Sequence, residues 1–233
     1  LIFGGSGQDF ILGGRDIKNI RSGEDNDFVV GGNDASIVLG NEGDDWLEGG
    51  DGLDDMAGDN AELFLDSRII GHDVLNGRRN DSVYMGESGD DIMVQGESVM
   101  RNEGMWGFDW AIYKGINHGI EADLTISVFA TEALNTLRDR FDSVEGVSGW
   151  DYDDVLIGDD RVYDAAAQAA GPGVTAATGE GVFFMDGLDQ AGVNRIAGLN
   201  PIIPRLGADG YFNGANVLLG GGGSDLMWGR GGD

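Results

Sequence analysis

The sequence has no cysteine, only three prolines and few cationic residues. Without cysteine, a disulfide framework, a thiol nucleophile and a thiolate metal site are all excluded. Proline is too scarce beside 43 glycines for a collagen-like chain, which also needs glycine at every third position. No apolar run is long enough for a transmembrane helix, and no signal peptide opens the chain. The abundant glycine is therefore expected to serve turns.

The shortage of cations leaves the chain strongly acidic. Lys and Arg number 14 against 42 Asp and Glu, which gives a formal charge of -28. A compact fold with this charge repels itself, and nucleic acid is not expected as a partner because phosphate would meet a negative surface. Disorder fits poorly, since 41% of the residues are hydrophobic and five are Trp. We therefore expect bound cations to be part of the fold.

A period of nine residues organises about half of the sequence. Six nonapeptides follow one another from Gly4 to Ala57, and a second run in one frame extends from Arg68 to Ile112. Isolated units stand at 149–157 and 220–228, and both ends of the chain read as cut within a repeat, as in a piece of a longer protein. The eighth position is almost always apolar, as at Ile11, Ile20, Val29, Val38, Leu47, Met56, Leu75, Met93, Leu156 and Met227.

This period predicts an all-β fold, a parallel β-roll of the solenoid class. Positions one to six form a turn in which glycine permits left-handed backbone angles, and positions seven to nine form a short strand. The side chain at position eight points inward. Two nonapeptides make one coil, and stacked coils form two parallel sheets over a thin core.

The units resemble the RTX family motif Gly-Gly-x-Gly-x-Asp-x-U-x, in which U is a large apolar residue. The resemblance implies that turn carbonyls and the Asp at position six bind several Ca²⁺ ions, each between turns two repeats apart. Calcium suits such sites because it accepts about six to eight oxygens in flexible geometry. A glycine-rich acidic loop without metal is the alternative, but a loop needs no apolar residue at every ninth position. The implied ligand positions are Gly5, Gly7, Asp9, Gly23, Asp25, Asp27, Gly43, Asp45, Gly52, Asp54, Gly71, Asp73, Gly89, Asp91, Gly107, Asp109, Asp154, Gly223 and Asp225.

Alternate turns share an edge of the roll, so ligands are compared in steps of 18 residues. In the first block one edge carries Asp at every sixth position, whereas the other carries Lys18 and Ser36. The second block is also one-sided, with Ser82 and Met100 on its poor edge. If residues 58–67 form one turn and strand with one inserted residue, the edge that carries the calcium ligands changes near Gly52. We expect Asn, Ser and Asp to close the unloaded turns through side-chain hydrogen bonds, and the metal-free chain to be largely unfolded.

Non-repeat segments divide the roll into residues 1–112, 144–160 and 214–233. The insertion at 113–143 is predicted to hold a strand at 122–128 and a helix that begins at Thr131. The insertion at 161–213 is rich in Ala and Gly at its start, and its apolar runs are expected to pack on the roll. Val144 and Leu156 are expected in the core.

Catalytic chemistry is not expected in this chain. His72 and His118 read as turn and loop residues, and no HExxH or GxSxG pattern occurs. Trp106, Trp110 and Trp150 are expected to pack rather than to stack on sugars. The fragment is therefore predicted not to be an enzyme, although the protein it belongs to can be one.

The family resemblance implies a module that folds on Ca²⁺ outside a Gram-negative cell and supports type I secretion, stability and display of a larger protein. The stretches 49–61, 69–77 and 102–111 resemble the RTX region of large secreted bacterial haem peroxidases of the animal-peroxidase type. Any haem would then lie elsewhere in that protein. The expected partners are calcium and the rest of the parent chain. The alternatives are a module that binds a cell-surface glycan, as in adhesins, and a stand-alone hydrolase.

Overall fold

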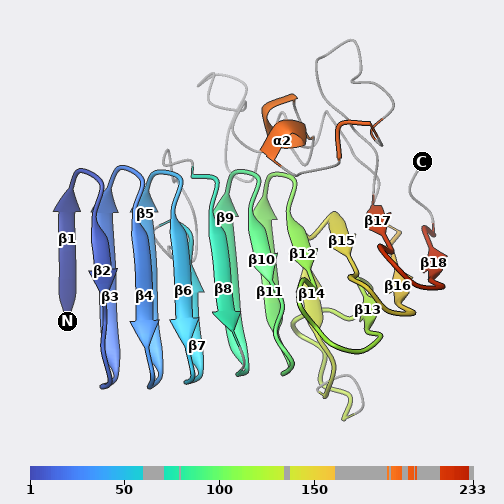
Figure 1. Ribbon diagram of the computed structural model, residues 1–233, viewed down its shortest axis with the longest axis horizontal. Helices are drawn as coiled ribbons and strands as arrows, with labels where there is room; N and C mark the ends of the chain where they lie inside the picture. Colours follow the sequence, from blue (N-terminus) through green and yellow to red (C-terminus); the bar gives the residue numbers. More distant parts are fainter. Residues whose placement is uncertain are drawn as a thin grey trace.

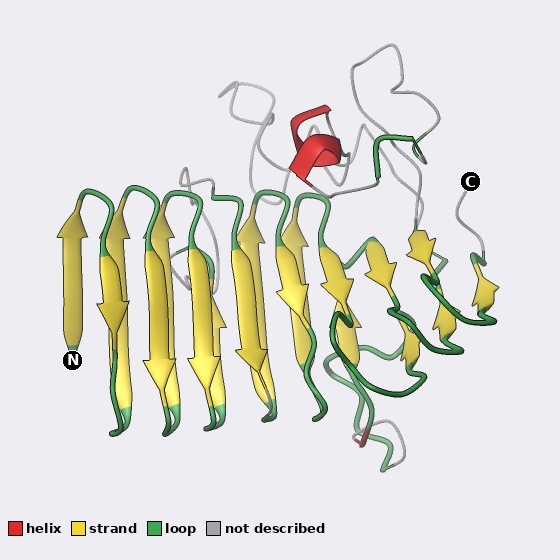
Figure 2. Cartoon of the chain, in the orientation of Figure 1, coloured by secondary structure: helices red, strands yellow, loops and turns green. Residues whose placement is uncertain are grey.

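The computed structural model is a parallel β-roll whose coils stack along one axis (Figures 1 and 2), and it confirms the predicted fold class. The residues that it describes are 1–59, 71–78, 80–133, 137–160, 188, 190–195, 199–201, 203 and 216–230. Every strand pair is parallel, and the strands form three sheets rather than the two predicted from the sequence. No helix among the described residues has the length and apolar character needed to cross a membrane.

The strands alternate between two sides of the roll. Sheet A holds, in spatial order, β1 (Ile2–Ser6), β3 (Lys18–Glu24), β5 (Ser36–Glu42), β7 (Asp54–Ala57), β9 (Ser82–Ser88), β11 (Arg101–Trp106) and β14 (Arg140–Asp142). Sheet B holds β2 (Phe10–Leu12), β4 (Phe28–Gly32), β6 (Trp46–Gly50), β8 (Val74–Arg78), β10 (Ile92–Val94), β12 (Trp110–Ile112), β15 (Gly146–Ser148) and β17 (Val217–Leu219). Sheet C holds β13 (Glu121–Asp123), β16 (Val155–Ile157) and β18 (Leu226–Trp228).

The side chains at position eight form the core, as predicted. Ile2 lies opposite Ile20, and Ile20 opposite Val38, so the register repeats every 18 residues. The predicted core residues are buried except Met227, which is 47% exposed because β18 is the outermost strand of sheet C. Val144 is fully buried, as expected. The same column also buries Tyr84 and the polar Asn102, whose amide oxygen accepts a hydrogen bond from Gln95 (2.8 Å).

Two kinds of turn connect the sheets. We call the edge where sheet A strands lead into sheet B the A-to-B edge, and the edge where sheet B strands lead onward the B-to-A edge. In Figure 1 these are the upper and lower edges of the roll. Several strands are longer than predicted: β3, β5, β9 and β11 continue through positions one to three of the next repeat. On the A-to-B edge the turn proper is thus confined to positions four to six.

The predicted change of edge between the two blocks is wrong. Trp46 on β6 lies opposite Val74 on β8, and Asp54 on β7 lies opposite Ser82 on β9. Strands β7 and β9 are direct neighbours in sheet A, and β6 and β8 are direct neighbours in sheet B. The A-to-B turn that begins at Gly58 therefore ends at Asp73, and both blocks keep their aspartate-rich edge on the same side.

The insertion at 113–143 differs from its prediction. Strand β13 covers only Glu121–Asp123, and Ser127 forms a single bridge with Phe141. The described part of 131–141 contains no α-helix, and its last residues belong to β14, which pairs with β11 in sheet A. Strand β13 pairs instead with β16. A later segment thus takes the place beside β11, and the roll resumes before residue 144.

The described parts of the second insertion pack on sheet B near the A-to-B edge. Helix α2 (Gln190–Arg195) lies above that edge in Figure 1. Its Val193, together with Leu188 and Leu199, joins a buried cluster with Phe108 and Trp110. Most of 161–213, including Phe183–Met185, lies outside the described residues.

Candidate metal sites

Aspartates at position six form a continuous ladder along the A-to-B edge. The amide of Asp9 donates to Oδ1 of Asp27 (2.7 Å), and the amide of Asp27 donates to Oδ1 of Asp45 (2.7 Å). The amide of Asp45 donates to Oδ1 of Asp73 (2.7 Å) across the interruption. The same bond then links Asp73 to Asp91 (2.8 Å) and Asp91 to Asp109 (2.9 Å). Each carboxylate is therefore held in one orientation by the coil before it.

The second oxygen of each carboxylate has no hydrogen-bond partner. This holds for the buried Oδ2 atoms of Asp9, Asp27, Asp45, Asp73, Asp91 and Asp109. In most of these turns Oδ2 folds back over the glycine at position one of its own repeat, and a Cβ on Gly40, Gly86 or Gly104 would collide with it. Buried polar atoms are normally satisfied, so a row of unpartnered carboxylate oxygens fits a set of bound cations.

Burial acts strongly on these acids. Desolvation raises the pKa of Asp45 to about 7, and it raises the pKa of Asp73, Asp91 and Asp109 well above the ordinary value, with further contributions from neighbouring carboxylates. Adjacent strands are only about 4.8 Å apart, so charged carboxylates in this row repel one another. A divalent ion between neighbouring coils would offset both the desolvation of these carboxylates and their mutual repulsion.

Backbone carbonyls would have to supply most of the oxygens of a metal site here. Among the described residues, no three His, Asp or Glu side chains converge on one point. Glycine at positions two and four admits carbonyls: a Cβ on Gly23 would collide with the carbonyl of Gly5, and one on Gly107 with that of Gly89. Gly23 and Gly107 also have positive φ (125° and 127°), which favours glycine. One carboxylate and several carbonyls per turn is an oxygen set that Ca²⁺ accepts.

The remaining predicted ligands on this edge lie in the same turns. Positions two and four of the first coil are Gly5 and Gly7, both with positive φ. Asp25 replaces glycine at position four with φ 74°, and its Oδ2 accepts a bond from the amide of Gly7 (3.2 Å). The other position-four residues of this edge are Gly43, Gly71 and Gly89. A metal-binding role for each of these residues stays a prediction.

Position five carries a second ladder that runs in the opposite direction. Asn26 accepts from the amide of Asp44 (3.1 Å), Asp44 accepts from the amide of His72 (3.0 Å), and Nδ1 of His72 accepts from the amide of Asp90 (2.8 Å). His72 is therefore a turn residue, as predicted. The two ladders together fix the spacing of the coils.

The B-to-A edge has donors where the other edge has acceptors. At position six, Nζ of Lys18 donates to the carbonyl of Asp16 (2.8 Å). Ser36 and Ser82 donate likewise to the carbonyls of Asp34 and Asn80 (both 3.3 Å). In each case the acceptor is position four of the same turn. These bonds confirm that the serine turns close through their side chains.

Acidic position-six residues also occur on the B-to-A edge. Asp54, in the turn of Gly52, accepts from the amide of Ser36 (2.8 Å), has an unpartnered Oδ2, and burial raises its pKa to about 6. Near the C-terminal end, Asp154 accepts from the amide of Ile120 (3.0 Å), and Asp225 accepts from that of Asp154 (3.0 Å). Gly223 precedes Asp225 with φ 114°. This end repeats the amide-to-carboxylate ladder of the A-to-B edge, but Oδ2 of Asp154 accepts a hydrogen bond from the amide of Trp150 (3.1 Å).

Sequence analysis missed two acidic residues in these ladders. Glu145 accepts from the amide of Asp109 (2.9 Å) and extends the A-to-B ladder. Asp139 accepts from the amide of Met100 (2.8 Å) on the opposite edge. Both directly precede a short strand whose middle residue, Val147 or Phe141, is buried. The pattern of an acid followed two residues later by an apolar residue could have found them.

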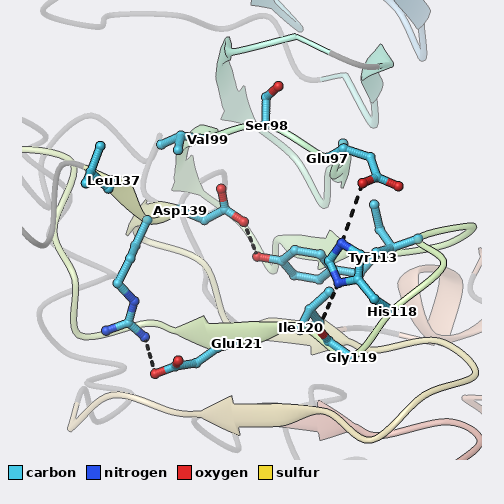
Figure 3. Close-up of a pocket in the computed structure, with 13 residues that line it drawn as sticks. Glu97, Ser98, Val99, Tyr113, His118, Gly119, Ile120, Glu121, Leu137 and Asp139 are labelled. Carbon is cyan, nitrogen blue, oxygen red and sulfur yellow. Dashed lines mark hydrogen bonds and ion pairs between the residues drawn. The ribbon is translucent and has the colours of Figure 1, made fainter.

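A cavity of about 320 Å³ lies on the B-to-A edge around Asp139 (Figure 3). The hydroxyl of Tyr113 donates to Oδ2 of Asp139 (2.7 Å), and burial raises the pKa of both groups. His118 pairs with Glu97 across the mouth (3.5 Å), and Arg138 pairs with Glu121. His118 lies in a loop, as predicted. Here a tyrosine takes the place that a cation would take beside other position-six acids.

Comparison with known families gives one match. The family model of the RTX calcium-binding nonapeptide repeat matches four copies, over residues 1–17, 21–56 and 212–233. Searches of curated proteins and of solved structures find no match. The matched residues include the A-to-B turns of Asp9, Asp27 and Asp45 and the turn of Asp225. The structure places the unmatched strands β8–β12 in the same sheets as the matched ones.

Proposed function

We propose, on the premise that this chain carries RTX calcium-binding nonapeptide repeats, that it is a module that folds on Ca²⁺ and stabilises a larger secreted bacterial protein. RTX repeats bind Ca²⁺ and occur in secreted bacterial proteins, and the repeat itself is non-catalytic. Catalysis, including the proposed haem peroxidase activity of the parent protein, would then lie in other parts of that protein.

The unpartnered Oδ2 atoms of the A-to-B ladder carry this proposal. Six aspartates of one edge present a buried carboxylate oxygen without a hydrogen-bond donor. Each ion would contact oxygens of neighbouring coils, and those coils exist as a site only in the folded roll. Metal binding and folding are therefore coupled. At low intracellular Ca²⁺ the chain would stay largely unfolded, as export through a type I channel requires, and it would fold outside.

Carbohydrate binding has less support. Phe10, Phe28 and Trp46 form a row on sheet B in which Phe10 and Trp46 are exposed and Phe28 is half-buried, and their rings stack on one another with centroids 5.3 and 6.1 Å apart. Stacking covers the ring faces that a sugar would use and leaves mainly ring edges to a ligand. We therefore favour calcium-dependent folding over glycan recognition.

Circular dichroism tests the proposal directly. Calcium-free protein at pH 7.5 should give the spectrum of a largely unfolded chain, and millimolar CaCl₂ should restore the β spectrum with a cooperative midpoint. MgCl₂ at the same concentration serves as the control, because Mg²⁺ demands near-octahedral geometry and sheds water reluctantly. A full β spectrum in chelator, unchanged by calcium, would show that the roll folds without the ion and would refute the proposal.

A further inference from the structure

We propose that Asp59, which lies outside the nonapeptide motif, supplies a second carboxylate to the calcium site at the interrupted turn between Gly58 and Asp73, and that this site binds Ca²⁺ most tightly in the roll. The inference rests on the proposed function and deepens it by ranking the sites. The nonapeptide motif accounts for Asp73 at this turn but not for Asp59.

Asp59 stands at position two of its turn, where the motif has glycine. The column of position-two residues on the A-to-B edge runs through Gly5, Gly23, Asn41, Asp59, Glu87 and Met105. The first two coils keep the glycine, whereas the next three carry side chains with oxygen atoms. Asp59 is the first carboxylate of this column, and it directly precedes the interruption.

The side chain of Asp59 is buried and directed into the turn. It is 0% exposed, and its Oδ2 accepts a hydrogen bond from the amide of Ser88 (3.2 Å). Its Oδ1 is buried without a hydrogen-bond partner. A surface acid would be solvated by water, but Oδ1 has neither water access nor a donor. A cation bound beside it would satisfy this oxygen.

Oxygens from three segments face the same space as Oδ1 of Asp59. The point where a Cβ on Gly71 would lie is 3.0 Å from Oδ1 of Asp59 and 3.0 Å from Oδ2 of Asp73, and it is closer still to the carbonyl oxygen of Gly43. The oxygens of Asp59 and Asp73 are both unpartnered. Two carboxylates and a carbonyl of the preceding coil thus border one space beside Gly71, which the absence of a side chain there keeps open.

Charge explains why this site should be the tightest. Calcium affinity rises with the number of charged ligands and with the rigidity of the site. Asp73 is held by the amide of Asp45 and Asp59 by the amide of Ser88, so neither carboxylate must be ordered on binding. One ion would also hold together Asp59 and Gly71, which are separated in the sequence by residues 60–70, and would offset the loop-closure entropy of that stretch.

Stepwise removal of calcium from the loaded, folded chain with graded chelator at pH 7.5, with bound calcium measured at each step, tests the inference. The wild type should show one ion bound about tenfold to a hundredfold more tightly than the others. Asp59→Asn should remove that step and leave the weaker ones. Asp59→Gly, which restores the motif residue, should do the same and keeps the test valid if the amide variant does not fold. Glu42→Gln removes one exposed charge from the same edge and should titrate like the wild type.

The outcomes separate the two claims. If both Asp59 variants titrate like the wild type, Asp59 is not a ligand, although the chain remains a calcium-folded module. If Glu42→Gln loses the tight step as well, the effect is one of net charge, and the proposed ligand role fails. If the wild type binds no calcium at all, the proposed function fails first, and the ranking of its sites fails with it.

Discussion

The two edges of the roll differ in the side chain at position six of the turn, which is a hydrogen-bond acceptor on one edge and mostly a donor on the other. On the A-to-B edge the side chain at position six is an acceptor, and at Asp45, Asp73 and Asp91 its outer oxygen is buried without a donor. On the B-to-A edge, Lys18, Ser36 and Ser82 donate from the same position to the carbonyl at position four. Where position six is an acceptor, two electronegative groups face each other, and under the proposed function an ion lies between them. Where it is a donor, the turn closes by itself.

Under the proposed function, this difference divides the roll into parts with different calcium requirements. On the A-to-B edge the carboxylate ladder runs from Asp9 to Glu145, and calcium would be needed along it. On the B-to-A edge a position-six carboxylate accepts from a neighbouring coil at Asp54 and, near the C-terminal end, at Asp154 and Asp225. The residue type at position six would then decide whether a coil binds calcium.

The largest effect is expected from pH in the absence of metal. Burial raises the folded-state pKa from 3.8 to about 6 for Asp54 and to about 7 for Asp45, and raises that of Asp73 and Asp91 well above the ordinary value. A raised carboxyl pKa contributes stability that is fully present below the unfolded-state value and is lost as pH rises through the folded-state value. The metal-free roll should therefore be most stable near pH 4 and should unfold between about pH 5 and 8.

Calcium should reverse that dependence, because its ligands must be deprotonated. Thermal unfolding followed by circular dichroism at pH 4.5, 6 and 7.5, with metal-free buffer and with millimolar CaCl₂, measures both slopes. The metal-free midpoint should fall with pH and the calcium midpoint should rise. A metal-free midpoint that rises with pH would contradict the assignment of buried, unpaired carboxylates.

Asp91→Asn should give the next largest effect, and its sign should depend on calcium. The Asn side chain keeps the shape of Asp, and its oxygen can still accept a hydrogen bond from the backbone amide of Asp73. The substitution removes the ionisable carboxyl group of a residue that is 0% exposed. Loss of one ion held at a hundred times its dissociation constant would cost about 3 kcal/mol in calcium. Without metal the same change should stabilise the roll, since a buried charge is removed.

The matched change on the other edge is Ser82→Ala. It removes only one hydrogen bond of 3.3 Å, so the loss should be about 1 kcal/mol and equal with and without calcium. Urea unfolding of both variants, in CaCl₂ at pH 7.5 and in calcium-free buffer at pH 6, where part of the metal-free roll is expected to be folded, gives the four free energies of unfolding that are compared. Equal calcium dependence of the two variants would remove the distinction between the edges.

The sequence was sufficient to predict the parts of the fold that repeat. A period of nine with apolar residues at position eight led directly to the buried column of Ile20, Val38 and Met56, because strand alternation leaves one inward position per strand. Comparing the repeats in steps of 18 residues predicted which position-six side chains share an edge. Lys18 and Ser36 were predicted to be non-ligands on chemical type alone, and both donate to a carbonyl of their own turn.

The predictions that were wrong concern segments whose place in the fold depends on which strands pair. Residues 58–67 could be counted either as an extra strand or as an interruption, and only the pairing of β7 with β9 decides between them. Strand β14 replaces β13 beside β11, a choice between two short segments with similar patterns. Asp59 was missed because position two is not a side-chain ligand position in the motif, so no repeat-based signal marks it.

The smallest effect is expected from Lys18→Asp, which converts a donor turn into an acceptor turn. In chelator the variant loses the bond from Nζ to the carbonyl of Asp16 and should be less stable by about 1 kcal/mol. In calcium the new carboxylate can fold over Gly13, as the other position-six acids fold over their glycines, and the loss should disappear. Arg15→Asp makes the same change of charge at an exposed position of the same turn, so it should respond much less to calcium. The difference between the two variants, measured as the calcium-induced shift in the unfolding midpoint, isolates position six. If Arg15→Asp responds to calcium as strongly as Lys18→Asp, general charge rather than position six controls the turn.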